Sequence, residues 1–186
     1  GDVYKRQGQD IAQFSLEQLR RRVAVVLQDV FLFSGSIAEN VRLGNQEITD
    51  EQVALALHLA CADRFIAELP GGMDYPVTER GSTFSAGQRQ LLSFARAIAH
   101  NPAVFVLDEA TASIDTDTEQ LIQQSVRNVS SGRTTIIIAH RLSTIRDCDC
   151  IYVLRSGRIR EQGTHEELMA LGGIYQKLHD MQIKDA

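Results

Sequence analysis

Tryptophan is absent from this 186-residue sequence, cysteine occurs only three times, and no long apolar run is present. The most apolar stretches, "AVFVL" and "TIIIA", are far shorter than the roughly 18 residues of a membrane-spanning helix. Cys61, Cys148 and Cys150 form no regular framework, so we expect reduced thiols rather than a disulfide-stabilised fold. The "CDC" tripeptide lacks a second pair of ligands, which argues against a metal site there.

An excess of basic residues is missing as well. The formal net charge is -5, which argues against binding to duplex nucleic acid, and we expect no nucleic-acid partner. The length suits one domain, with or without a subdomain, and is sufficient to bury a core.

Short β-branched apolar stretches alternate with helical patterns. Residues 23–28, 103–110 and 133–140 are typical of strands covered on both faces. "CIYVLRSGRIREQG" predicts a hairpin around Ser156-Gly157. Helices are predicted at 50–62, 116–129, 164–171 and 174–181. This order predicts an α/β fold with a mainly parallel sheet. Residues 44–99, helical without a convincing strand, predict an inserted helical subdomain.

Polar residues follow the three predicted parallel strands. The first ends at Gln28, the second at Asp108-Glu109 and the third at His140. Ligands of open parallel sheets bind outside the carboxyl ends of the strands, so one site is expected. Asp108 would hold a metal, and Glu109 would orient or deprotonate a water aimed at a phosphate. Each residue alone has a simpler explanation: Gln28 could be a turn residue, Asp108-Glu109 could favour the N-terminus of a helix, and His140 could be structural. Their joint occurrence at three strand ends favours the site.

Five motifs carry a resemblance to the ATP-binding cassette (ABC) ATPases. "FSAGQ" resembles the family's "LSGGQ" signature, "VFVLDE" the Walker B motif and "ASID" the D-loop. "IIIAHRLSTI" resembles the switch-histidine region, and "VVLQDVFLFSGSIAENV" the Q-loop. The resemblance runs from about Gly8 to the C-terminus. Each motif alone is weak, but all five in this order are specific.

The resemblance implies a P-loop NTPase (RecA-like) core, ATP and Mg²⁺ as ligands, and a dimer of cassettes with ATP at the interface. Glu109, His140 and Gln28 would be catalytic, and Asp108 and Gln28 would hold the magnesium, partly through water. The D-loop positions are Ser113 and Asp115. The signature residues, which would bind ATP held by the facing cassette, are Phe84, Ser85, Ala86, Gly87 and Gln88.

The sequences of these motifs are most similar to those of bacterial exporters. "PVTERGSTFSAGQ" resembles the segment that meets an exporter's membrane domain, with Glu79 at its acidic position. The combination of "ERGSTFSAGQRQLLSFARA" with "ATASIDTDTE" most resembles subunits of heterodimeric multidrug exporters. The resemblance therefore implies two partners: a transmembrane domain and a second cassette. A non-identical second cassette is favoured over an identical one. The implied location is the cytoplasmic face of the plasma membrane. Glu79 and Gln28 would couple the cassette to the membrane domain.

The family's P-loop, "GxxxxGK[ST]", does not occur in the sequence, and neither does Gly-Lys-Ser or Gly-Lys-Thr. We expect a cassette truncated at its N-terminus, with residues 1–7 as a foreign junction; the alternative is a divergent relative without a P-loop. The expected organisation is a core at 8–43 and 101–163, a helical subdomain at about 44–100 and C-terminal helices at 164–182. Alone, such a chain should hydrolyse ATP negligibly.

One departure from the signature and two alternative functions are left open. Ala86 replaces the third signature residue, glycine, which fits either an impaired ATP site or a tolerated substitution. A soluble ABC-type ATPase that acts on nucleic acid or ribosomes is one alternative function. A non-catalytic fragment that offers signature and D-loop surfaces to a partner is the other.

Overall fold

The computed structural model describes residues 5–6, 9–27, 30–78, 81–109, 115–139 and 142–184. The chain divides into two compact units, residues 1–138 and 139–186, which we describe one at a time. Within the described ranges, no helix is both long enough and apolar enough to cross a bilayer.

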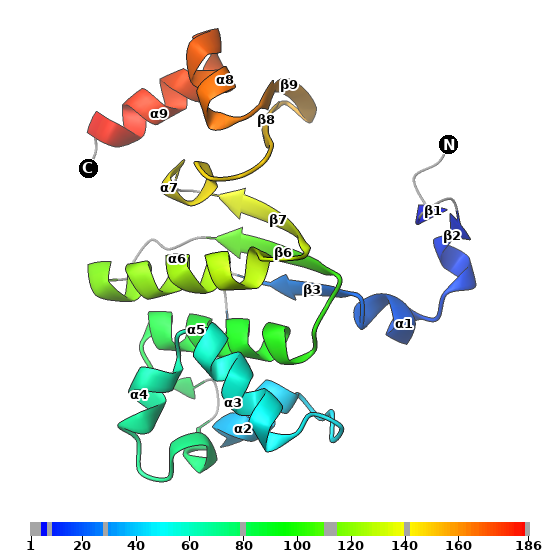
Figure 1. Cartoon of the computed structure of the whole chain (residues 1–186), viewed down its shortest axis with the longest axis vertical. Helices are drawn as coiled ribbons and strands as arrows, with labels where there is room; N and C mark the ends of the chain where they lie inside the picture. Colours follow the sequence, from blue (N-terminus) through cyan, green and yellow to red (C-terminus); the bar gives the residue numbers. More distant parts are fainter. Residues whose placement is uncertain are drawn as a thin grey trace. The chain divides into compact units, whose positions relative to one another are not determined.

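A three-stranded sheet forms the centre of the first unit, in the order β3 (Val23–Val26), β6 (Val104–Glu109) and β7 (Thr134–Ala139). β3 and β6 are parallel, with Val23 opposite Val104 and Val26 opposite Leu107. The three arrows point the same way in Figure 1. The predicted α/β fold with a parallel sheet is therefore confirmed, with each strand slightly shorter than its apolar run.

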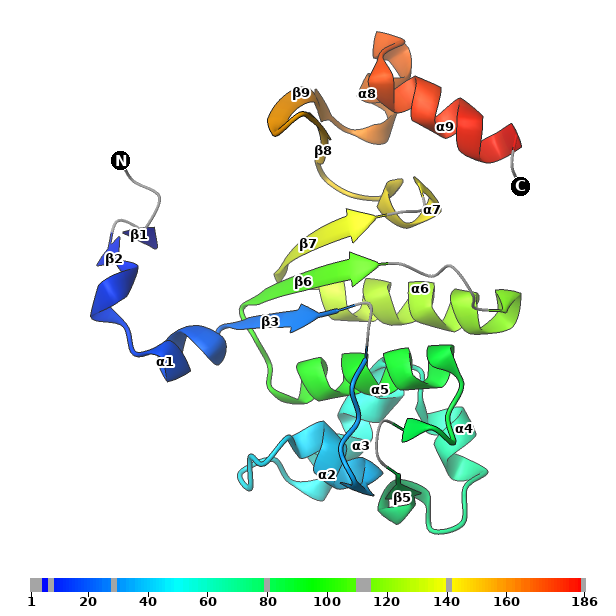
Figure 2. The ribbon, with the colours of Figure 1, turned by 180° about the vertical axis from the view of Figure 1, so that it is seen from behind.

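Two amphipathic helices cover one face of this sheet: α5 (Ala86–Ala99) and α6 (Thr116–Ser130). α6 lies in front of the strands in Figure 1 and behind them in Figure 2. Phe105 and Leu107 of β6 are buried in one cluster with residues of both helices. The side chains from α5 and α6 at the centre of this cluster are Leu91, Leu92, Phe94, Ile122 and Val126.

The opposite face of the sheet is open. Its side chains are 39–57% exposed; they are Val23, Val25, Leu27, Ile136 and Ile138. This corrects the prediction that these strands are covered on both faces. Their β-branched residues do favour strands, but the described part of the chain supplies a covering layer for one face alone.

The helical region contains α2 (Ile37–Arg42), α3 (Asp50–Leu59) and α4 (Asp63–Ala67), followed by the 3₁₀ turn η2 (Gly72–Asp74). The predicted helical insertion is present, and helix begins already at Ile37. α2 was missed because six residues carry too little periodicity. A further correction is the short antiparallel pair of β4 (Gly35–Ser36) with β5 (Pro76–Val77), which places a strand inside a region predicted to have none.

The N-terminal part consists of small elements. β1 (Lys5–Arg6) pairs with β2 (Gln9–Asp10), and the 3₁₀ turn η1 (Ile11–Gln13) follows. α1 (Leu16–Arg20) then leads into β3. Ser15 caps α1 through a reciprocal pair of hydrogen bonds with Gln18, which explains why so short a helix begins there.

The second unit contains α7 (Leu142–Ile145), the hairpin of β8 (Ile151–Arg155) and β9 (Arg158–Gly163), and the helices α8 (His165–Leu171) and α9 (Ile174–Lys184). Ser156 and Gly157 both have positive φ, the conformation of a two-residue hairpin turn, so the predicted hairpin is confirmed. The buried centre of this unit is formed by Ile151, Val153, Leu168 and Tyr175.

Candidate functional site

The N-terminus of α5 is the best-defined part of the candidate site. Ser85 is its N-cap: the Ser85 hydroxyl accepts a hydrogen bond from the Gln88 amide at 3.1 Å. The Gln88 side-chain oxygen accepts one in return from the Ser85 amide at 2.9 Å. This capping box explains why the helix begins at this point of the sequence. It also fixes two of the predicted signature residues in a defined geometry.

Phe84 anchors the turn before this helix. Its ring is buried, with the rings of Phe65 and Tyr75 each 6.1 Å away between centroids. Its carbonyl oxygen accepts a hydrogen bond from Nη1 of Arg89 at 2.6 Å. The Phe84 side chain therefore faces the core, whereas exposed Ser85 and Ala86 follow it at the surface.

The first turn of α5 suits an anion. Ala86 and Gly87 occupy its first two positions, where amide groups have no acceptor within a helix. No acidic side chain lies in this turn, unlike the first turn of α3, which carries Asp50 and Glu51. A neutral glutamine completes the cap, so the positive end of the helix dipole is not neutralised locally. Ala86 fits this first position without a positive φ.

Asp108 lies at the carboxyl end of β6. It alternates with Phe105 and Leu107 and therefore shares the open face with Val106. Val106 lies opposite Val25, which is 54% exposed. A half-buried carboxylate at this edge is the kind of oxygen ligand that Mg²⁺ prefers. Among the described residues, no group of three or more histidine, cysteine or acidic side chains is placed to hold a metal ion.

Asp115 is the N-cap of α6. Its carboxylate accepts a hydrogen bond from the Thr118 amide at 2.9 Å. This bond, followed by one from the Thr118 hydroxyl, lowers the pKa of Asp115 below its ordinary value. The group therefore remains ionised at neutral pH, on the exposed surface of the unit.

These features share one side of the first unit. In Figures 1 and 2, the N-terminal ends of α5 and α6 lie on the side to which the strand arrows point. The signature residues, Asp108 and Asp115 therefore lie toward the same edge of the sheet, the edge at which the strands end. The other predicted site residues, Gln28, Glu79, Ser113 and His140, lie outside the described residues, as does the side chain of Glu109.

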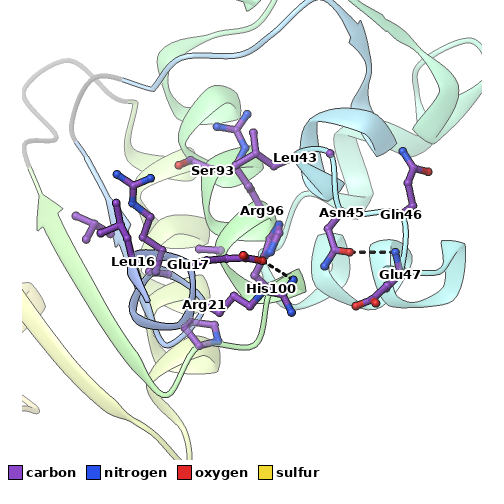
Figure 3. Close-up of a pocket in the computed structure, with 16 residues that line it drawn as sticks. Leu16, Glu17, Arg21, Leu43, Asn45, Gln46, Glu47, Ser93, Arg96 and His100 are labelled. Atoms are coloured by element: carbon purple, nitrogen blue, oxygen red, sulfur yellow. Dashed lines mark hydrogen bonds and ion pairs between the residues drawn. The ribbon is translucent and has the colours of Figure 1, made fainter. Parts of the chain in front are cut away.

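A cavity of about 1010 Å³ lies elsewhere in the first unit (Figure 3). It is bounded by α1, β3, the loop at 43–47 and the C-terminal half of α5. Arg96, Ala97 and His100 line it, but none of the predicted site residues does. The cavity therefore lies away from the candidate site.

A polar junction near the C-terminal end of α5 was not predicted from the sequence. Arg96 donates from Nε to the backbone oxygen of Asn40 at 2.9 Å and from Nη1 to that of Phe31 at 3.1 Å. A buried asparagine within an apolar helical stretch is the signal that could have indicated this contact. The two residues are 56 positions apart, so the pattern of the sequence alone does not pair them.

Comparison with known proteins identifies a family. The sequence model described as "ABC transporter" matches residues 1–112. The protein exp8 of Streptococcus pneumoniae, which is classed as an ABC transporter ATP-binding protein, is 57% identical over 173 residues, covering 93% of this chain and 30% of exp8. YheH of Bacillus subtilis, whose name describes a multidrug resistance ABC transporter ATP-binding/permease protein, is 51% identical over 94% of this chain and 26% of YheH.

A solved structure is similar as well. The structure of a bacterial Atm1-family ABC exporter with ATP bound matches with a TM-score of 0.85 and 43% identity. The match covers 95% of this chain and 31% of the exporter chain. The chain thus spans about a third or less of the length of these relatives.

Proposed function

Because this chain belongs to the ABC transporter ATP-binding family, we propose that it forms part of an ATP-hydrolysing cassette that drives export across a membrane. The observation that carries the proposal is the first turn of α5, a capped helix N-terminus without acidic side chains at the signature. Similarity to a solved ABC exporter and to a relative named for multidrug resistance supports the direction of transport.

The signature would bind ATP that a second cassette holds. The Ser85 hydroxyl can rotate to donate a hydrogen bond to a phosphate oxygen while it still accepts from Gln88. The amides of Ala86 and Gly87 would donate to the same γ-phosphate at the positive end of α5. Phe84 would hold the turn in place from within the core.

The hydrolytic side of the site would be built from residues at the strand ends. Asp108 and Gln28 would hold Mg²⁺, which neutralises phosphate charge when it is bound. Glu109 would orient or deprotonate the attacking water. His140 would contact the γ-phosphate.

Residues beyond the strand ends would connect the cassette to its partners. Ser113 and ionised Asp115 in the D-loop would contact the facing cassette. Gln28 and Glu79 would transmit the state of the nucleotide to the membrane domain. With these partners, the cassette would lie at the cytoplasmic face of the membrane.

A replacement experiment tests this function. We would replace the aligned part of YheH, which covers 26% of that protein, by this chain and keep the rest of YheH. The hybrid is expected to hydrolyse ATP and to export a YheH substrate, because this chain supplies the Walker B, signature and switch residues. Glu109→Gln in the hybrid should lower ATPase turnover by at least about a hundredfold. A folded hybrid without ATPase activity, or full turnover with Glu109→Gln, would contradict the proposal.

The 186-residue chain by itself is proposed to bind Mg-ATP weakly and to hydrolyse it negligibly. Its sequence contains no Gly-Lys-Ser or Gly-Lys-Thr, the end of the P-loop that surrounds the phosphates. The same observation favours a second candidate function, in which the chain offers only its signature and D-loop to a complete cassette. Turnover by the purified chain that Glu109→Gln abolishes would exclude that candidate. ATP-dependent cross-linking to a complete cassette, without turnover by the chain, would favour it.

The partner cassette is proposed to be non-identical. Ala86 adds a methyl group where a phosphate and the backbone approach closely, which fits a site of reduced activity beside a fully active one. In a transporter that pairs the hybrid with YheH, Ala86→Gly should raise the ATPase rate of the site that uses this signature. An unchanged rate would favour a tolerated alanine.

A further inference from the structure

Asn40 organises the segment that joins the sheet to the helical region. Asn40 lies in α2 and is 3% exposed. Its side-chain nitrogen donates to the carbonyl oxygens of Phe33 and Ser36, at 2.8 and 3.0 Å. Its side-chain oxygen accepts from the Phe33 amide at 2.8 Å. One buried side chain thus fixes both ends of the segment Phe33–Ser36.

Arg96 connects this segment to α5. Besides its bonds to the backbone oxygens of Asn40 and Phe31, its Nη2 donates to the Asn40 side-chain oxygen at 3.2 Å. Its guanidinium carbon lies 5.7 Å from the centre of the Phe33 ring. Figure 3 shows the side chain of Arg96 beside the cavity. We use the name clamp for Arg96 and Asn40 together.

The clamp depends on the shape of the guanidinium group. The three recorded acceptors of Arg96 are neutral oxygens, and burial lowers the pKa of the group. Placing a charge in such surroundings is costly unless several hydrogen bonds compensate it. The planar fork of arginine reaches several acceptors at once, which the single ammonium group of lysine does not do.

A second contact links the same segment to the turn before the signature. Leu32 is fully buried, and Gly81 approaches it closely. A Cβ atom placed on Gly81 would lie 2.6 Å from Cδ1 of Leu32. Gly81 has a φ of +61°, a conformation that suits glycine. The segment therefore packs against the part of the chain that leads into Ser85.

We propose that Arg96 and Asn40 are positioning residues that make the segment 30–36 move as one body with α5 and the signature. Arg96 lies ten residues after Ala86, about 15 Å along the helix, so a displacement at one end reaches the other through a rigid element. Phe31 and Phe33, 45% and 50% exposed, pack edge to face on this segment. The inference rests on the proposed function, since it describes how the signature would communicate with the region after Gln28.

Hydrogen exchange of the 186-residue chain tests the clamp itself. Arg96→Ala is expected to accelerate exchange of the Phe33 amide by roughly tenfold or more, because that amide donates to the Asn40 oxygen that Arg96 also contacts. Arg96→Lys should restore little of the protection, since lysine cannot reach all three oxygens. Arg89→Ala, on the same helix, is the matched control and should leave the exchange of this amide unchanged. Wild-type exchange in Arg96→Ala would overturn the proposal.

The YheH hybrid tests the communication. Arg96→Ala and Arg96→Lys should keep basal ATPase turnover within about twofold, while stimulation by a transported substrate should fall by roughly tenfold. Val126→Ala weakens the core away from the clamp. It should lower stability about as much as the Arg96 variants do, but it should leave stimulation by the substrate intact.

The outcomes separate the clamp from the proposed function. If stimulation falls in proportion to stability in all three variants, the clamp is merely structural and the proposal is overturned. If the wild-type hybrid hydrolyses no ATP, the proposed function fails and the communication fails with it. The exchange experiment still decides whether Arg96 holds the segment.

Discussion

The two faces of the β3–β6–β7 sheet are made from the same kinds of residue, yet they have different surroundings. On one face, Val26, Phe105 and Leu107 are at most 3% exposed beneath α5 and α6. On the other face, Val25 and Ile136 are more than half exposed. Parallel sheets are normally covered on both faces, so the open face is the unusual one.

The difference between the two faces indicates which residues of this unit contribute to stability and which to function. Phe105 and Leu107 hold the helix that begins at the signature, while Asp108 continues the open face at the end of β6. The buried face therefore positions α5, and the open face ends in the carboxylate proposed to hold Mg²⁺. Substitutions on the two faces should have separable effects.

The largest expected effect is that of Phe105→Ala on the buried face. Phe105 is completely buried, and its replacement removes a large side chain and leaves a cavity. We expect the free energy of unfolding to fall by roughly 3–5 kcal/mol. Urea denaturation followed by circular dichroism measures this. A loss no larger than that of Ile138→Ala on the open face would contradict the distinction between the faces.

Ser125→Ala tests the packing of the layer above the buried face. Ser125 of α6 is fully buried, and its hydroxyl has no hydrogen-bond partner within the described part of the chain. Removing an unpaired hydroxyl and improving helix propensity should raise the free energy of unfolding by about 1 kcal/mol. A higher midpoint in urea would agree with this. A lower midpoint would instead indicate that the hydroxyl makes a stabilising bond.

Much of the fold follows from local signals in the sequence. The alternation of apolar runs and helical patterns predicted the parallel sheet. The helices predicted to start at residues 50 and 116 do so, and Thr49 and Asp115 are their N-caps. The Ser156-Gly157 turn formed the predicted hairpin. Each of these features is decided by residues a few positions apart, which is why the sequence alone could predict it.

Features that depend on distant contacts were not predictable. An apolar strand has the same sequence pattern whether one or both of its faces are covered. The exposure of Val25 could therefore not be predicted from the sequence. The bonds of Arg96 to Asn40 and Phe31 cross 56 and 65 positions. The signature helix was located from its motif, but the capping by Ser85 and Gln88 that positions it emerged from the structure. The geometry around Gln28 and His140 stays a prediction.

Ile138→Ala tests how much a residue on the open face contributes to stability. Ile138 is 52% exposed, so truncation removes little buried surface. The free energy of unfolding should fall by about 1 kcal/mol or less, partly through the lower strand preference of alanine. Urea denaturation next to Phe105→Ala makes the measurement direct. A loss similar to that of Phe105→Ala would mean that the open face is covered in solution, for example by a second copy of the chain.

The smallest expected effect is a dependence on pH that arises from His100, on the covered side of the sheet. His100 follows α5 and is half-buried, and its Nε2 donates to the Arg42 carbonyl oxygen at 3.1 Å. Burial lowers the pKa of His100 below its ordinary value of about 6.5, despite the opposing effect of that hydrogen bond. The unfolded chain then binds this proton more readily than the folded chain, so stability falls as pH drops below about 6.5.

His100→Gln keeps a hydrogen-bond donor but cannot titrate. The difference in urea midpoint between pH 7.5 and pH 5.5 should therefore be smaller in this variant than in the wild type. Ile138→Ala introduces and removes no titratable group, so it should keep the wild-type difference between the two pH values. An equal pH dependence in His100→Gln would show that burial beside α5 does not affect this histidine.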